Sequence, residues 1–66
     1  MKIIINGSEK EFQTSGNLQE IIQLFSKQTK NIIAEVNGEI IRGVVWTNKK
    51  INDGDAIELV SFVGGG

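Results

Sequence analysis

The chain has 66 residues, with seven basic and eight acidic side chains and a formal net charge of −1. This length suits one small domain, and the near-neutral charge excludes the large basic field that binding to nucleic acid or an anionic membrane requires. The sequence contains no Cys and no His, which excludes disulfides and leaves no Cys or His ligand for a metal. Stability must therefore come from apolar packing.

The sequence gives no sign of membrane insertion or secretion. No apolar run approaches the roughly 20 residues that span a bilayer. The apolar stretch within residues 1–7 is too short for a secretory signal peptide. We therefore expect a cytoplasmic protein, and the absence of Cys is consistent with a reducing compartment.

The first segment predicts a β-hairpin. Lys2–Asn6 contains three consecutive isoleucines, which favour a strand. The pair Asn6 and Gly7 is a strong turn signal, because both residues tolerate a positive φ. Alternating polarity over Lys10–Gln13 predicts the returning strand, and residues 14–16 predict a loop.

The next segment predicts one amphipathic helix. Asn17 has the side chain of a helix N-cap, and Glu20 stands three residues later, where it completes a capping box. Apolar residues then recur at helical spacing on one face: Leu18, Ile21, Ile22 and Phe25. We expect the helix to end near Gln28 or Thr29.

A second hairpin is predicted after the helix. Ile32–Val36 and Glu39–Arg42 read as strands on either side of Asn37 and Gly38, a second turn signal. Residues 43–50 have weak strand character. They predict a short helical turn, which carries Val44, Val45 and Trp46.

The chain closes with one more strand. A tight turn at residues 53–55 leads into an apolar segment from Ala56 to about Val63. The order strand–strand–helix–strand–strand–strand predicts an α+β domain, in which a mixed sheet of four to five strands packs on one helix. This domain spans residues 1–63 and leaves residues 64–66 as a flexible glycine tail.

Period-two alternation gives the last strand two different faces. Ile57 and Leu59 are expected to point towards the helix. The opposite face is expected to carry Ile4, Glu58, Val60 and Phe62. In a two-layer domain that face is open to solvent, so these four residues predict a docking surface for partner proteins. The alternative is that a bent sheet or the 43–50 loop covers them.

Three other features each have two readings. Trp46 is more typical of a core residue than of a partner contact. Lys49 and Lys50 suit solvated surface better than a site that steers the domain to an acidic partner. Arg42 fits a structural hydrogen bond and a partner contact equally well.

The sequence ends in Gly64, Gly65 and Gly66. Glycine loses the most backbone entropy on ordering and buries no side chain, so these residues contribute little to stability. They are therefore either a leftover end or a working part. As a working part, Gly64 and Gly65 form a thin thread that can enter a narrow channel, and the carboxylate of Gly66 is the reactive group.

The ordered set of residues resembles a known family over essentially the whole chain. The frame consists of Val36-Asn37-Gly38, Ile41-Arg42, Trp46, residues 53–58 and Val63-Gly64-Gly65-Gly66. It is similar to the sulfur carrier proteins of thiamine biosynthesis, the ThiS family. One departure is Gly64, which stands where relatives can carry a small apolar residue. It is expected to loosen the tail slightly without affecting the chemistry.

The resemblance implies a ubiquitin-like β-grasp fold, with the first and last strands parallel at the centre of the sheet. It also implies that a ThiF-type adenylating enzyme activates the Gly66 carboxylate with ATP and Mg²⁺. A persulfide donor then supplies sulfur, leaving a thiocarboxylate that a ThiG-type thiazole synthase uses to build the thiazole ring. The chain itself then binds no cofactor or metal and is not an enzyme.

Other functions stay open at this point. The same chemistry could serve another pathway, as in the small subunit of molybdopterin synthase. A ubiquitin-like modifier would use the tail to form isopeptide bonds, and a plain β-grasp interaction module would not use it chemically. An independent enzyme is the least supported, because the chain lacks His, Cys and a convergent pair of carboxylates. The sequence does not identify the sulfur source.

Overall fold

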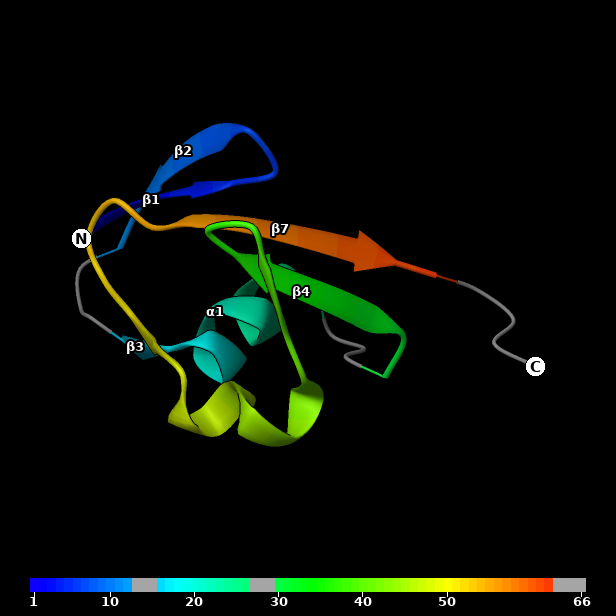
Figure 1. Cartoon of the computed structure of the whole chain (residues 1–66). Coiled ribbons are helices and arrows are strands. Elements are labelled where there is room, and N and C mark those ends of the chain that lie inside the picture. Colours follow the sequence, from blue (N-terminus) through cyan, green and yellow to red (C-terminus); the bar gives the residue numbers. More distant parts are fainter. Residues whose placement is uncertain (13–15, 27–29, 63–66) are drawn as a thin grey trace.

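The computed structural model describes residues 1–12, 16–26 and 30–62 of the chain. One five-stranded sheet forms the upper layer in Figure 1, and helix α1, Leu18–Phe25, lies beneath it. The strands of this sheet are β1 Lys2–Ile5, β2 Ser8–Glu11, β4 Ile32–Val36, β5 Glu39–Ile41 and β7 Ala56–Ser61. A 3₁₀ helix, η1 Gly43–Asn48, packs against α1 on the same side of the sheet.

The sheet has the spatial order β2-β1-β7-β4-β5. Strands β1 and β7 pair in parallel, with Ile4 opposite Ala56 and Ile5 opposite Ile57. The other three pairings are antiparallel. The predicted α+β architecture and the parallel pairing of the first and last strands are therefore confirmed.

Two-residue turns close both hairpins, as predicted. Asn6 and Asn37 have φ values of 49° and 53°, and Gly7 and Gly38 have φ values of 84° and 85°. Two successive positive φ values define the tight turn that matches the twist of a hairpin. Because the turn is this short, β2 begins at Ser8 and not at Lys10 as predicted. Gln13, the predicted end of that strand, lies outside the described residues.

The predicted capping box starts α1. The Glu20 amide donates to Asn17 Oδ1 at 2.9 Å, and the Asn17 amide donates to Glu20 Oε1 at 3.1 Å. The predicted end of the helix is wrong, because Ser26 has extended backbone with φ −148° and ψ 127°. One turn beyond the apolar stripe the sequence offers Gln28 and Thr29, whose polar side chains cannot anchor a further turn in the core.

The core lies between the sheet and α1. It consists of Ile3, Ile5, Leu18, Ile21, Ile22, Ala34, Val36, Ile41, Trp46, Ile51 and Ile57. Phe25 differs from its prediction, because 43% of its surface is exposed. Its ring instead meets the ring of Phe12 edge-on, with centroids 6.1 Å apart, at the margin of the core.

A second, two-stranded sheet joins the start of α1 to the segment after η1. Strand β3, Gly16–Asn17, pairs antiparallel with β6, Lys50–Ile51. The prediction that Gly16 lies in a loop is therefore wrong. Each of these strands is too short to show periodicity, so the sequence did not indicate the pairing. A Cβ at Gly16 would lie 2.8 Å from Glu20 Oε1, so a side chain there would displace the carboxylate that accepts from the Asn17 amide.

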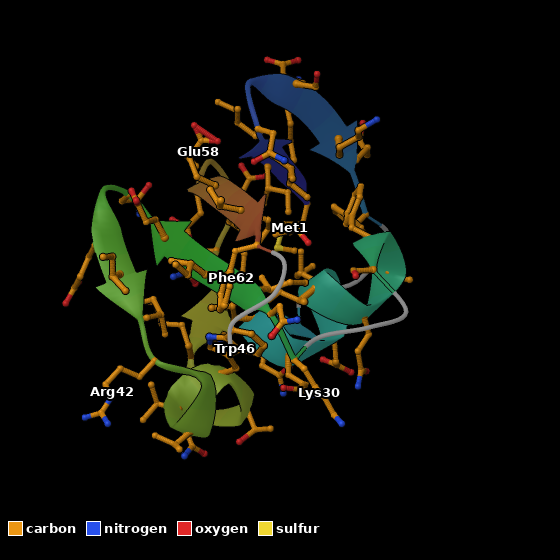
Figure 2. All side chains as sticks on the ribbon, turned by 90° about the vertical axis from the view of Figure 1, so that its right-hand side faces the viewer. Met1, Lys30, Arg42, Trp46, Glu58 and Phe62 are labelled. Atoms are coloured by element: carbon orange, nitrogen blue, oxygen red, sulfur yellow. The ribbon has the colours of Figure 1, made fainter. Side chains whose placement is uncertain are left out.

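Trp46 is a core residue, as predicted. It lies on η1 with 6% of its surface exposed, and its indole Nε1–H donates to the carbonyl oxygen of Ile41 at 2.8 Å. This bond ties η1 to the end of β5. Figure 2 shows Trp46 inside the molecule, whereas Arg42 at the start of η1 points outwards.

We expect Trp46→Phe to lower the free energy of unfolding by about 2 kcal/mol, because it removes packed volume and leaves the buried Ile41 carbonyl without its donor. Chemical denaturation measures this loss. Val44→Ala on the same 3₁₀ helix is the matched control, since 78% of Val44 is exposed, and it should cost less than about 0.5 kcal/mol. Equal losses in the two variants would contradict the role given to Trp46.

Candidate functional site

The site is built around β7, the strand that leads to the glycine tail. It lies between β1 and β4 in the sheet and points away from the N-terminal end of the molecule (Figure 1). Its inward face behaves as predicted: Ile57 is 1% exposed, and Leu59 packs against the core. A strand held from both sides and from below is a rigid base for whatever follows it.

The Asn37 side chain and backbone fix the start of β7. The Asn37 amide donates to the Ala56 carbonyl at 2.7 Å, and the Ala56 amide donates to Asn37 Oδ1 at 3.0 Å. Asn37 Nδ2 also donates to Asp55 Oδ1 at 3.0 Å. The second hairpin turn is therefore hydrogen-bonded to the residues that open the last strand.

The first hairpin turn supports the far half of β7 in a similar way. The Asn6 amide donates to the Ile57 carbonyl at 2.9 Å, and the Leu59 amide donates to Asn6 Oδ1 at 2.8 Å. A side chain thus extends the ladder one step beyond the end of β1. On the other side, the Phe62 amide donates to the Asn31 carbonyl at 2.9 Å, so the backbone is held as far as Phe62.

The face of the sheet opposite α1 exposes the four residues predicted for docking. Ile4 is 36% exposed, Val60 54% and Phe62 41%, and Glu58 is also exposed. The 43–50 segment does not cover them, because η1 packs on the helix side. Looking at the end of β7 in Figure 2, Phe62 lies near the centre and Glu58 points outwards. The predicted exposure is confirmed, and docking itself remains a prediction.

The sheet register adds further residues to this surface, which we call the open face. It consists of Lys2, Ile4, Glu9, Glu11, Ile33, Glu35, Ile40, Ala56, Glu58 and Val60, with Phe62 following β7. Ile33 and Ile40 are 42% and 63% exposed and were missed by the sequence analysis. Period-two alternation could have predicted their exposure, because each directly precedes a buried residue, Ala34 or Ile41.

The side of β7 that faces α1 is mainly apolar. A hollow of about 260 Å³ lies there, lined by Ile5, Phe25, Ile32, Leu59 and three polar residues, Asn6, Ser26 and Ser61. None of the described residues that line it carries a carboxylate or an amine. Within the described ranges, no group of three or more Asp or Glu residues could hold a metal ion, and no helix is long and apolar enough to cross a membrane.

The remaining candidates are three basic residues and the three terminal glycines. Arg42 is exposed, and its side chain forms no hydrogen bond or ion pair with any described residue, so the structure gives no support to a structural role. Lys50 is exposed and Lys49 partly buried. Residues 63–66 lie outside the described residues, so Gly64, Gly65 and Gly66 are predicted site residues that the structure does not test.

A mixed sheet with two parallel central strands, packed on one helix, defines a β-grasp domain of the ubiquitin-like class. The ThiS family model matches residues 3–66, and the chain belongs to the ThiS family. The solved structures agree. The crystal structure of the thiamine biosynthesis protein ThiS from Geobacter metallireducens superposes with a TM-score of 0.87 at 30% identity, covering 100% of both chains.

Two curated relatives extend the comparison. The sulfur carrier protein ThiS of Bacillus subtilis is 33% identical over 63 residues, which cover 94% of this chain and 96% of that protein. The thiazole synthase of Paramagnetospirillum magneticum is 33% identical over 66 residues. The match covers 100% of this chain but only 20% of the length of the synthase.

We expect Asn6→Gly to speed hydrogen exchange at the Leu59 amide by about fivefold relative to the Val60 amide, because it removes the acceptor of one hydrogen bond while keeping the positive φ. Residue-resolved exchange measures the ratio. Asn37→Gly is the matched control, since it changes a residue of similar φ at the other turn and should leave the ratio unchanged. A ratio that Asn6→Gly does not alter would contradict the support assigned to the Asn6 side chain.

Proposed function

We propose that this chain is a sulfur carrier of thiamine biosynthesis, and that the carboxyl group of Gly66 carries the sulfur. The observation that carries this proposal is the family match, which extends over residues 3–66 and so includes the terminal glycines. The described residues support it in a second way. They hold β7, the strand that leads to the glycine tail, between two neighbouring strands of the sheet. We propose that partner enzymes act on this tail and that the chain itself is not a catalyst.

A carboxylate must be activated before it reacts, because its oxygen is a poor leaving group. A ThiF-type partner, using ATP and Mg²⁺, converts the Gly66 carboxylate to an acyl-adenylate and releases pyrophosphate. The terminal sulfur of a persulfide then attacks the carbonyl carbon and displaces AMP. A thiol cleaves the resulting sulfur–sulfur bond, giving a thiocarboxylate and a disulfide. ATP and Mg²⁺ belong to the partner, and the carrier binds no cofactor.

The loaded thiocarboxylate is a sulfur nucleophile that a ThiG-type thiazole synthase takes up. The relative named thiazole synthase supports this partner, since the whole of this chain matches a part of that protein. We place the exchange in the cytoplasm, where ATP is available to the activating enzyme. The persulfide donor is a third partner.

The tail supplies reach and a narrow cross-section. Three residues at about 3.3–3.6 Å each give a thread of roughly 10 Å when fully extended. Without Cβ atoms, Gly64 and Gly65 can pass a channel that excludes other residues. We propose that the β-grasp domain binds each partner in turn through its exposed sheet face. The residues proposed for this contact are Phe62, Val60, Ile4 and Glu58.

Intact-mass spectrometry tests the proposal after incubation with ATP, a persulfide source and the ThiF-type enzyme. The chain should gain the mass difference between sulfur and oxygen, localised to Gly66, and only when ATP is present. Covalent adducts with other proteins would instead indicate a modifier. No change in mass with an active enzyme would contradict the carrier function.

Gly65→Val should abolish adenylation while leaving the melting temperature unchanged, because the branched side chain blocks the channel and the tail contributes little to the fold. Pyrophosphate release measures adenylation, and circular dichroism follows the melting. Gly64→Ala is a milder control that should retain activity. Normal adenylation of Gly65→Val would rule out a narrow channel.

Phe62→Asp should weaken binding to the activating enzyme by about tenfold or more, because it places a charge where an aromatic anchor is proposed. Titration calorimetry gives the affinity. Val44→Asp makes a comparable change on exposed η1, away from the open face, and should bind normally. If the two variants bind equally well, Phe62 is not part of the docking surface.

A further inference from the structure

Two carboxylates stand directly opposite each other at the middle of the open face. Glu35 of β4 and Glu58 of β7 are register partners in the antiparallel pairing. Directly opposed residues have Cβ atoms about 4.5–5.5 Å apart, and like charges in this position are destabilising. The free protein therefore keeps an unfavourable pair at the centre of its most exposed sheet surface.

No cation of the described chain relieves this pair. The side chains of Glu35 and Glu58 form no ion pair or hydrogen bond with any described residue. The one basic residue on the described strands of the open face is Lys2, which lies opposite Glu11 in the β1–β2 pairing. Glu58 points away from the body of the molecule, as Figure 2 shows, and is exposed, whereas Glu35 is half-buried. A partner can therefore reach the pair from the side of Glu58.

Apolar side chains border the pair on the same face. Ile33 and Val60 are register partners in the row that lies one step nearer the tail. Ile40 lies directly opposite Glu35 on its other side. All three are at least 42% exposed. A partner that covers these side chains must also take both carboxylates out of water, which is costly unless the partner supplies an opposite charge.

We propose that the open face docks an apolar protein surface that inserts one arginine or lysine side chain between Glu35 and Glu58. The inference rests on the sulfur carrier function proposed above and specifies the partner chemistry at its docking surface. An arginine suits the position best, because its planar fork can donate hydrogen bonds to two carboxylates at once. Ile33, Ile40 and Val60 then form the apolar contacts around it.

Charge argues against the other occupants. The open face carries four glutamates, Glu9, Glu11, Glu35 and Glu58, against one lysine. A second copy docked through the same face would bring acidic groups against acidic groups. Anionic lipid and nucleic acid would be repelled for the same reason. A basic protein surface is the occupant whose charge complements this face.

The test uses the double variant Glu35→Gln/Glu58→Gln of the full chain and the ThiF-type activating enzyme. In the free protein the variant should raise the melting temperature by about 2 °C, because the repulsion is gone. In the same samples it should weaken binding by about tenfold and flatten the salt dependence of the affinity, because the contact with the cation is gone. If Glu35 and Glu58 acted only in folding, the variant would change the melting temperature without weakening binding to the enzyme.

Glu39→Gln is the matched control. It removes the same charge at an exposed position whose register partner, Val36, points into the core, so it lies off the open face. Both the melting temperature and the affinity should stay unchanged. The proposal would be overturned if the double variant bound the activating enzyme as tightly as the wild-type chain does. It would also be overturned if sedimentation showed that the wild-type chain forms a dimer through this face.

The outcome is separable from that of the carrier function, because affinity is measured without ATP. If Gly66 is never loaded but the double variant still binds less tightly, the carrier function fails and the charged contact stands. If wild type and double variant are loaded equally and bind equally, the carrier function stands and the charged contact fails.

Discussion

The parallel pairing of β1 with β7 is the constraint on which the rest of the structure depends. It places the first and last strands side by side within one sheet, so β7, the strand that leads to the tail, is flanked on both sides by β1 and β4. The two Asn-Gly turns add hydrogen bonds to β7, because the side-chain oxygens of Asn6 and Asn37 accept from the amides of Leu59 and Ala56. The backbone of the last strand is thus held by hydrogen bonds as far as Phe62, directly before the terminal residues.

Local signals predicted most of this fold. The capping box at Asn17, both hairpin turns and the position of Trp46 follow from neighbouring residues, whose preferences act over a few positions. The pairing of β3 with β6 and the early end of α1 at Ser26 could not be predicted in that way. The first depends on two-residue strands far apart in sequence. The second depends on where the core ends, since Phe25 in the last turn of α1 is already 43% exposed.

The candidate site was predictable to a similar degree. Alternation along β7 placed Val60 and Glu58 on the exposed face, but the extent of that face needs the register between strands. Ile33 and Ile40 join it only because β4 and β5 are adjacent to β7 in the sheet. The opposition of Glu35 and Glu58 likewise exists only once the register is known. The proposed docking surface therefore depends on how the strands are arranged in the sheet, whereas the proposed reactive group, the Gly66 carboxylate, follows from the sequence alone.

The proposed carrier function requires that sulfur reaches the thiazole ring through the carboxyl carbon of Gly66. A single-turnover reaction tests it most directly: the chain is loaded with isotopically labelled sulfur, mixed with thiazole synthase and its substrates, and both the chain and the thiazole are analysed by mass spectrometry. If Gly66 carries the sulfur, the label should leave Gly66 at the same rate as it appears in the thiazole ring. Unlabelled thiazole formed at the normal rate, with the chain still carrying its label, would contradict it.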